Sequence, residues 1–264
     1  MEEAHEMNLQ LDGARVVVTA AASGIGLAIA RAYACEGATV EICDVDDEAL
    51  DALRTDEPGI GVARCDVTDR EAVDAFIDAA VERLGGLDVL VNNAGIAGPT
   101  ARIEDVTFDE WDRCIATCLG SQFNCIRRAV PHLRRSSNAS IVNLSSAAGR
   151  MGFALRTPYA AAKWGVVGLS KSLAVELGPD RIRVNAILPG IVAGERQRRV
   201  LETKAQRRGM SFDAIEAEAF AHASLGEYVT PKQVADQVLF VTSELGRTIT
   251  GQALSVCGDL KALA

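Results

Sequence analysis

The chain has few histidines, and it has no apolar run long enough to cross a membrane. It contains three histidines and no CxxC motif, so a cysteine–histidine metal site is not expected. Its seven cysteines are scattered and odd in number, which predicts reduced, buried thiols. Three of them, Cys114, Cys118 and Cys125, have a spacing that could place them on one helical face. The first residues also lack the basic and apolar regions of a secretory signal, so we expect a cytoplasmic protein.

Positive charge is scarce as well. The 27 lysines and arginines are outnumbered by 36 acidic residues, which gives a net charge of −9. This balance argues against a nucleic acid or an anionic membrane as a partner. Repeats, low-complexity tracts and glycine–serine linkers are missing too. With 264 residues, of which 48% are hydrophobic, the chain suits one large α/β domain.

Strand-like and helix-like segments alternate along the chain, which predicts a Rossmann-type doubly wound parallel sheet with helices on both faces. About seven strands are expected: Arg15–Ala20, Thr39–Cys43, Val62–Cys65, Val89–Val91, Ile141–Leu144, Arg183–Leu188 and Ala253–Val256. The expected helices are Ser23–Glu36, Asp47–Arg54, Asp69–Leu84, Phe108–Arg135, Pro158–Leu177 and Pro231–Ser243. Residues 1–10 are expected to form a flexible tail and residues 11–264 a single domain. The polar segment 191–229 interrupts the alternation and is long enough to form a helical substrate lid.

Tyr159, followed four residues later by Lys163, is the most informative feature of the chain. Thr157 is expected to cap a helix whose first residue is Pro158, so the phenol and the ammonium share one helix face. A neighbouring positive charge favours the phenolate and lowers the tyrosine pKa from its usual value of about 10. The pair is therefore a candidate acid/base, although the same spacing also occurs by chance in ordinary helices.

The first expected strand runs into the turn 19–26, which opens a helix. Glycines at positions 24 and 26 would let the backbone approach a pyrophosphate at the positive end of that helix. Asp44 ends the second strand, where a carboxylate accepts hydrogen bonds from a ribose and repels the 2′-phosphate of NADP. No basic residue follows Asp44, which favours NAD. The structural alternatives are a tight strand–helix turn and a solvated acidic helix start, the latter fitting residues 46–48 better than Asp44.

Small or polar residues follow four further strands. These are the segments 66–68, 92–95, 145–149 and 189–192. The carboxyl ends of parallel strands meet at one edge of the sheet, where open α/β sheets bind their ligands. A single binding site explains these turns better than a separate cap on each strand.

On these motifs the chain, from Leu11 to its C-terminus, resembles the short-chain dehydrogenase/reductase family in its compact branch. The resemblance implies that Tyr159 is the acid/base and that Lys163 lowers its pKa and holds the cofactor ribose. It also implies that Ser146, at the family's usual spacing before Tyr159, bonds the substrate oxygen, with Ser145 as the backup. The implied cofactor-binding residues are Gly24, Ile25 and Gly26 at the pyrophosphate, Asp66 and Val67 at the adenine, Asn93 at the ribose, Ile191 at the nicotinamide amide, and in addition Ser23, Ala94, Gly95, Pro189 and Gly190.

Three positions depart from the family pattern. Ala20 stands where a glycine is usual, which is harmless only at a negative φ. Cys118 stands where an asparagine is usual; the family's proton relay uses the backbone carbonyl of that asparagine, so the carbonyl is kept and the side-chain amide is lost. Gly194 stands where a threonine often contacts the nicotinamide amide or phosphate. We expect activity to be retained with a different relay geometry.

The sequence thus predicts an NAD-dependent oxidoreductase that interconverts a small secondary alcohol and a ketone. Homodimers or homotetramers are expected, paired through the helices Phe108–Arg135 and Pro158–Leu177. A sugar, a polyol, a hydroxy acid and an alicyclic alcohol all remain open as substrates. An NAD-binding sensor without catalysis and a nucleotide-sugar epimerase are the alternative functions. Several basic residues could clamp an anionic substrate group, or could simply belong to a solvated helix: Arg150, Arg156, Arg196, Arg198, Arg199 and His222.

Overall fold

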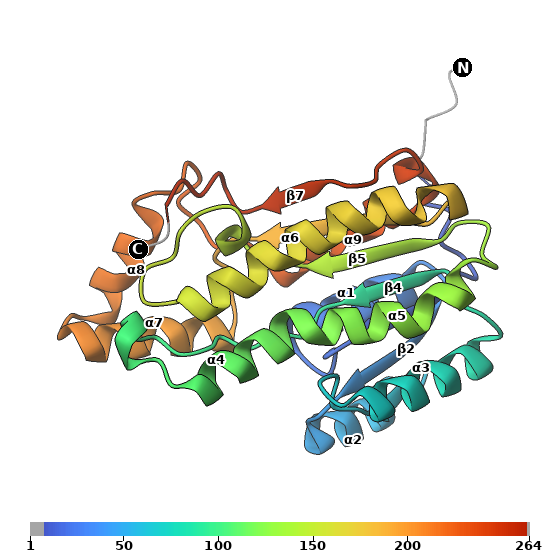
Figure 1. Ribbon diagram of the computed structural model, residues 1–264, viewed down its shortest axis with the longest axis horizontal. Coiled ribbons are helices and arrows are strands. Elements are labelled where there is room, and N and C mark those ends of the chain that lie inside the picture. Colours follow the sequence, from blue (N-terminus) through green and yellow to red (C-terminus); the bar gives the residue numbers. More distant parts are fainter. Residues whose placement is uncertain (1–7, 263–264) are drawn as a thin grey trace.

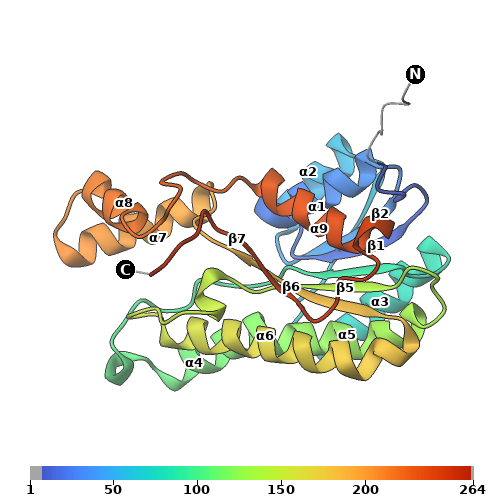
Figure 2. The same cartoon turned by 90° about the horizontal axis from the view of Figure 1, so that it is seen from above.

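The computed structural model describes residues 8–262 and contains a seven-stranded sheet between two layers of helices (Figures 1 and 2). The strands are β1 (Arg15–Thr19), β2 (Thr39–Asp44), β3 (Ile60–Arg64), β4 (Val89–Asn92), β5 (Ser140–Leu144), β6 (Arg183–Pro189) and β7 (Ala253–Val256). Their order is β3-β2-β1-β4-β5-β6-β7, and every neighbouring pair is parallel. The predicted fold class is confirmed.

The helices cover both faces of the sheet. They are α1 (Gly24–Cys35), α2 (Asp47–Asp56), α3 (Arg70–Leu84), α4 (Phe108–Ile115), α5 (Ser121–Leu133), α6 (Thr157–Leu177), α7 (Glu195–Arg208), α8 (Phe212–Phe220) and α9 (Pro231–Thr242). Helices α1, α2 and α9 lie on one side of the sheet, and α3, α4, α5 and α6 lie on the other (Figure 2). Val16 and Val18 join the core under the first layer and Val17 joins the core under the second, as the two-residue period of a strand requires. Because both faces are buried, the strands read as continuous apolar runs.

The predicted elements occur within two residues of their expected positions, with two local differences. The expected helix Phe108–Arg135 contains a π-turn at Ala116–Gly120, which separates α4 from α5. The wider turn changes the phase of the helix, so Cys125 packs in a different core cluster from Cys114 and Cys118. The three cysteines, whose spacing allowed one shared helical face, therefore do not share one.

The second difference is at the start of α6. Arg156 is the N-cap, Thr157 is the first helical residue, and no side chain caps the helix. Pro158 fits this shift because proline is tolerated throughout the first helical turn. All seven cysteines are free, and all but Cys35, which is exposed at the end of α1, are buried.

Helices α7 and α8 project beyond the carboxyl ends of the strands (Figures 1 and 2). The segment that contains them is closed at its base: the Ala193 N–H donates to the Val229 carbonyl (2.8 Å), and the Val229 N–H donates to the Ile191 carbonyl (2.9 Å). An apolar cluster joins the two helices: Leu201, Ala205 and Ile215. The two hydrogen bonds and the apolar cluster hold α7 and α8 together as one unit within the segment 191–229.

The predicted tail, residues 1–10, falls mostly on residues 1–7, which lie outside the described residues together with 263–264. Leu9, in the described part, packs against the core, and its carbonyl accepts a hydrogen bond from the Glu244 N–H (3.4 Å). Within residues 8–262, no helix combines the length and the apolar character that crossing a membrane requires.

Ala20 has a φ of +50°, in the left-handed region, rather than the negative value that would make its Cβ harmless. A side chain in that region costs about 1–2 kcal/mol, whereas a glycine there costs only its extra chain entropy of about 0.5–1 kcal/mol. We predict that Ala20→Gly raises the free energy of unfolding by about 0.5–1 kcal/mol. Denaturant unfolding measures this change. Ala21→Gly is the control: Ala21 has no positive φ, so this variant should lose stability, and equal losses in both variants would contradict the prediction.

Candidate active site

A cleft of about 670 Å³ opens at the carboxyl edge of the sheet, between the strand ends and α7. Most of the residues predicted for the site line it: Ser23, Gly24, Ile25, Asp44, Asn93, Gly95, Ser146, Tyr159, Lys163, Pro189, Gly190 and Ile191. They come together because the strands that precede them are parallel and end at one edge. Four predicted residues do not line the cleft: Gly26, Asp66, Val67 and Ala94.

Asp66 and Val67 do not line this cleft, and their place at the adenine stays a prediction. They come after β3, which is the outermost strand of the sheet, beyond β2. The Asp66 carboxylate closes its own turn, since Oδ1 accepts hydrogen bonds from the N–H (2.9 Å) and the hydroxyl (2.8 Å) of Thr68. Ala94 is buried behind the cleft, where its N–H donates to Thr19 Oγ1 (3.3 Å).

Tyr159 and Lys163 lie one turn apart on α6. The Lys163 Nζ is 5.7 Å from the centroid of the Tyr159 ring, and the lysine is buried. Nζ donates a hydrogen bond to the Leu144 carbonyl at the end of β5 (2.7 Å). An ammonium has three hydrogens, so two remain for other acceptors. The first turns of α6 thus place a phenol beside an ammonium group that has used one of its three hydrogen-bond donors.

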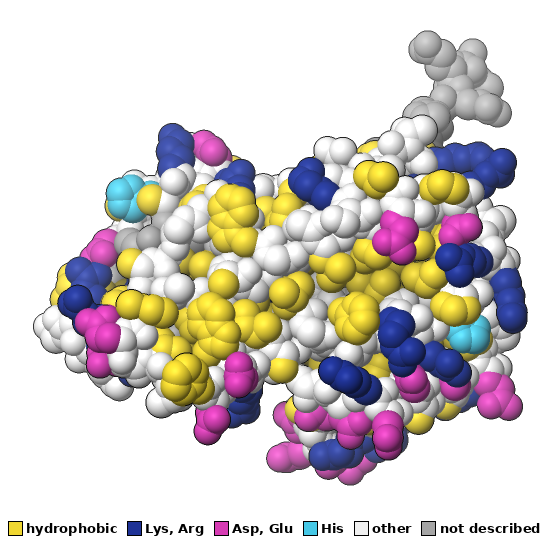
Figure 3. Space-filling view, in the orientation of Figure 1, with side chains coloured by type: hydrophobic (Ala, Val, Ile, Leu, Met, Phe, Trp, Pro, Cys, Tyr) yellow, Lys and Arg dark blue, Asp and Glu magenta, His cyan; other side chains and the backbone are white. Residues whose placement is uncertain are grey.

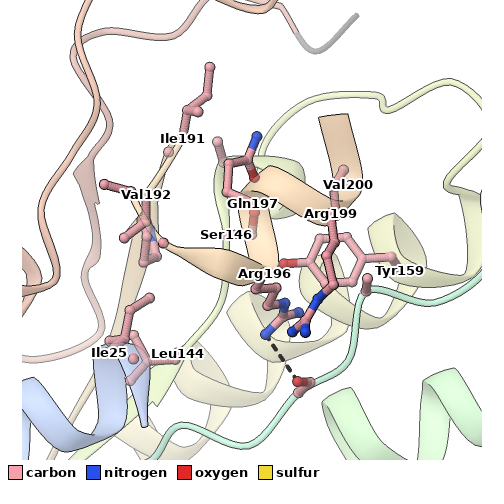
Figure 4. A pocket seen from close by; sticks show the side chains of 18 of the residues that line it. Ile25, Leu144, Ser146, Tyr159, Ile191, Val192, Arg196, Gln197, Arg199 and Val200 are labelled. Atoms are coloured by element: carbon pink, nitrogen blue, oxygen red, sulfur yellow. Dashed lines mark hydrogen bonds between the residues drawn. The ribbon is translucent and has the colours of Figure 1, made fainter. Parts of the chain in front are cut away.

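The two serines after β5 have different partners. Ser145 Oγ is buried and donates to the Lys163 carbonyl (2.7 Å). Ser146 Oγ accepts a hydrogen bond from the Ala148 N–H (3.2 Å), which leaves its hydroxyl hydrogen free to donate. Figure 4 shows Ser146 and Tyr159 at the same part of the cavity. This arrangement favours Ser146 over Ser145 as the donor to a substrate oxygen.

The turn before α1 is built for an anion. Gly24 has a φ of +56°, and the N-cap Ser23 makes no side-chain hydrogen bond to the helix. The N–H groups of the first helical turn have no intrahelical partners, so they stay available to a phosphate. Gly26 lies beneath the turn: a Cβ there would be 2.6 Å from the Ala20 carbonyl oxygen and 2.7 Å from the Ala21 Cα. A glycine is therefore required at position 26 by the close packing of α1 against the turn, whether or not a cofactor binds there.

Asp44 ends β2 beside the same turn. Its Oδ2 accepts a hydrogen bond from the Ala22 N–H (3.0 Å), and Oδ1 accepts one from the Val45 N–H (2.7 Å). Arg64, which pairs with Asp44 in the register of β2 and β3, donates instead to Asp47 Oδ2 (3.1 Å). No ion pair to Asp44 occurs among the described residues, so its charge is available at the cleft. The turn and the carboxylate together fit the phosphate and ribose groups of a dinucleotide.

Cys118 occupies the π-turn between α4 and α5 and is buried beneath the cleft. Its Sγ exchanges hydrogen bonds with the backbone N–H and carbonyl of Ile96 (3.4 Å each), and its carbonyl accepts one from Gln122 Nε2 (3.4 Å). The hydrogen bond with Cys114 and the positive charge of Lys163 lower the pKa of Cys118. The cysteine puts a thiol where the family has an amide, so the departure changes the polar contacts beside Lys163.

The basic residues considered as an anion clamp separate into two groups. Arg156, Arg196 and Arg199 line the cleft, whereas Arg150, Arg198 and His222 do not. Arg150 instead donates to the Leu260 carbonyl (3.1 Å), and Arg198 pairs with Glu202 (2.9 Å). Lys204, which was not predicted from the sequence, also lines the cleft. The available signal was weak: Lys204 is one of many basic residues on a polar helix, and its burial depends on how α7 packs.

Comparisons with known proteins agree with this geometry. A family model described as enoyl-(acyl carrier protein) reductase matches residues 19–259. The chain is 40% identical to a monensin polyketide synthase putative ketoacyl reductase from Streptomyces virginiae (92% of this chain, 95% of the relative). It is 39% identical to a trans-4-hydroxycyclohexanecarboxylate dehydrogenase from Sinomonas cyclohexanicum (92% and 90%). Among solved structures, an actinorhodin polyketide ketoreductase variant with NADPH matches with a TM-score of 0.88 at 34% identity, over 93% of this chain and 96% of that one.

Proposed function

The chain belongs to the short-chain dehydrogenase/reductase family, and from this we propose that it is an NAD-dependent oxidoreductase that interconverts a secondary alcohol and a ketone. Its relatives support an NAD(P)-dependent oxidoreductase acting on CH–OH groups; the choice of NAD, the residue roles and the assembly are part of the proposal. The observation that carries it is the convergence of Tyr159, Lys163 and Ser146 in one cleft with the free N-terminus of α1. We further propose that the protein works in the cytoplasm, where unpaired cysteines stay reduced.

The proposed roles follow from the hydrogen-bonding capacity of each side chain. The bound nicotinamide carries the hydride. Ser146 donates its free hydroxyl hydrogen to the substrate oxygen, and Tyr159 takes or returns the proton of that oxygen at its Oη. Lys163 stabilises the phenolate with the ammonium hydrogens that the Leu144 carbonyl leaves free. The N-terminus of α1 and Asp44 hold the pyrophosphate and the adenosine ribose, and the segment 191–229 acts as a lid over the substrate.

The direct test is the formation of NADH from NAD with a panel of secondary alcohols, including hydroxyacyl thioesters, sugars, polyols and hydroxycyclohexanecarboxylates. We expect saturable turnover with at least one class. NADH binding without turnover of any member would favour the NAD-binding sensor. Retention of enzyme-bound NADH without net reduction would favour an epimerase.

We propose that the assembly is a homodimer or homotetramer built on the face that α4, α5 and α6 present. Exposed apolar side chains gather there (Figure 3): Phe108, Phe123, Trp164 and Val175. A self-complementary apolar face of this kind is what a two-fold interface needs.

Phe123→Glu is therefore expected to shift the protein toward smaller species, because it places a charge on α5 within that face. Light scattering coupled to size exclusion measures the mass. Leu245→Glu changes an exposed apolar residue outside α4, α5 and α6 and serves as the control. A monomeric wild type, or an unchanged mass in Phe123→Glu, would contradict this interface.

A further inference from the structure

Two buried cations line the substrate end of the cleft without an acidic partner. Lys204 on α7 is 8% exposed and Arg156, the N-cap of α6, is 3% exposed. Neither forms an ion pair with any residue in 8–262, and Lys204 donates no hydrogen bond to them. Basic side chains are almost never buried this deeply unless they are paired, because a charge loses its hydration on burial. Their burial therefore calls for a ligand.

Both cations surround one aromatic ring next to the acid/base. The Arg156 guanidinium carbon is 5.1 Å from the centroid of Phe153 and 5.2 Å from that of Tyr159. The Lys204 Nζ is 5.5 Å from the centroid of Phe153. One Arg156 nitrogen donates to the Ala97 carbonyl, but Nε is buried and has no partner within the described residues. The Arg156 Nε and the Lys204 ammonium, neither of which has a hydrogen-bond partner among the described residues, thus both lie beside Phe153 in the wall of the cleft.

The electrostatics of the pair agree with this geometry. Burial lowers the pKa of Lys204, and the charges of Arg208 and Arg156 lower it further. Burial also lowers the pKa of Arg156. The acid that acts on Lys204 is Glu218 on α8, but its carboxylate bonds to Arg208 (2.6 Å). Without a bound anion, no described acidic side chain forms an ion pair with the Lys204 ammonium.

The mouth of the cleft adds to the positive charge. Arg196 and Arg199 extend from α7 beside Tyr159 (Figure 4), and Arg196 donates to the Gly95 carbonyl (3.0 Å). Glu195 is the one acidic residue of α7 that lines the cleft, and it is exposed. Figure 4 places Ile25 of α1 across the cavity from Tyr159, so the phosphate end and this cationic end are separate.

We propose that the substrate is a secondary alcohol, or its ketone, that carries a carboxylate, and that Lys204 and Arg156 bind this carboxylate beside Phe153. The inference rests on the proposed function, because the position of Tyr159 fixes where the reacting carbon must lie. The guanidinium next to the Tyr159 ring places the anion close to that carbon, which predicts a compact hydroxy acid. The ring of Phe153 supplies an apolar surface for the hydrocarbon between the two groups.

The test compares matched acids and esters as substrates: 4-hydroxycyclohexanecarboxylate and 3-hydroxybutyrate, each with its methyl ester. We expect kcat/KM to favour the acid by about tenfold or more, and Lys204→Met to reduce that preference by about tenfold, which corresponds to about 1.4 kcal/mol. Lys204→Arg should restore part of it. Lys232→Met, which removes an exposed lysine paired with Asp236 on α9, is the control that should keep the wild-type preference.

A binding measurement separates this proposal from the proposed function. Cyclohexanecarboxylate and cyclohexanecarboxamide are titrated into the NADH complex of the wild type and of Lys204→Met. Turnover of acid and ester at equal rates would overturn the anion site and leave the proposed function standing. Lys204-dependent binding of the carboxylate without turnover of any alcohol would support the anion site and count against the proposed function. Equal, weak binding of carboxylate and carboxamide would overturn the anion site.

Discussion

Tyr159→Phe is expected to lower turnover by about a thousandfold or more, because it removes only the hydroxyl that exchanges a proton with the substrate. The ring, its contact with Arg156 and the helix start are all kept. NADH affinity, measured by the fluorescence of the bound cofactor, should change by less than about twofold, since the lost interaction belongs to the transition state.

Tyr33→Phe is the matched control for this result. Tyr33 is fully buried and does not line the cleft, and its hydroxyl bonds to Thr242 Oγ1 (2.6 Å). Its loss should cost stability of about 1 kcal/mol and leave kcat near the wild-type value. Wild-type turnover in Tyr159→Phe would remove the tyrosine from the proposed mechanism.

Asp44→Ala is expected to reduce the preference for NAD over NADP by about a hundredfold. Two like charges at hydrogen-bonding distance near a protein surface repel by several kcal/mol, and the alanine removes that repulsion of the 2′-phosphate. The ratio of kcat/KM values for the two cofactors, with one substrate, measures the effect.

Asp44→Asn separates the charge from the local structure. The amide oxygen can still accept the hydrogen bond from the Ala22 N–H, so the turn before α1 should persist while the negative charge is gone. Asp46→Asn is the control, because Asp46 caps α2 and does not line the cleft. An unchanged cofactor ratio in both Asp44 variants would show that Asp44 does not select the cofactor.

The sequence was sufficient to predict the sheet and most of the cleft, because both depend on local patterns. Apolar runs with turn residues at their ends fix the strands, and parallel pairing brings those ends to one edge. The same reasoning placed Asp66 and Val67 at this edge of the sheet, but it could not show which edge residues line the cleft and which close their own turns. That depends on long-range packing, which no short motif records.

The cationic end of the cleft shows a second limit. In the sequence, Arg156 is one of six candidates for an anion clamp, and Lys204 looks like an ordinary basic residue of a polar helix. Their significance comes from burial against Phe153, and burial is a property of how α7 closes on the sheet. The positive φ of Ala20 could likewise not be inferred, because the family pattern identifies the position but not its conformation.

The most direct test of the central claim is to follow hydride and proton chemistry together, using secondary alcohols deuterated at the carbinol carbon. After incubation with NAD, mass spectrometry of the reduced cofactor should find the deuterium transferred by the wild type and nearly none transferred by Tyr159→Phe. Deuterium retained on the alcohol after NADH has formed, or transferred equally by both proteins, would contradict a tyrosine-assisted hydride transfer in this cleft.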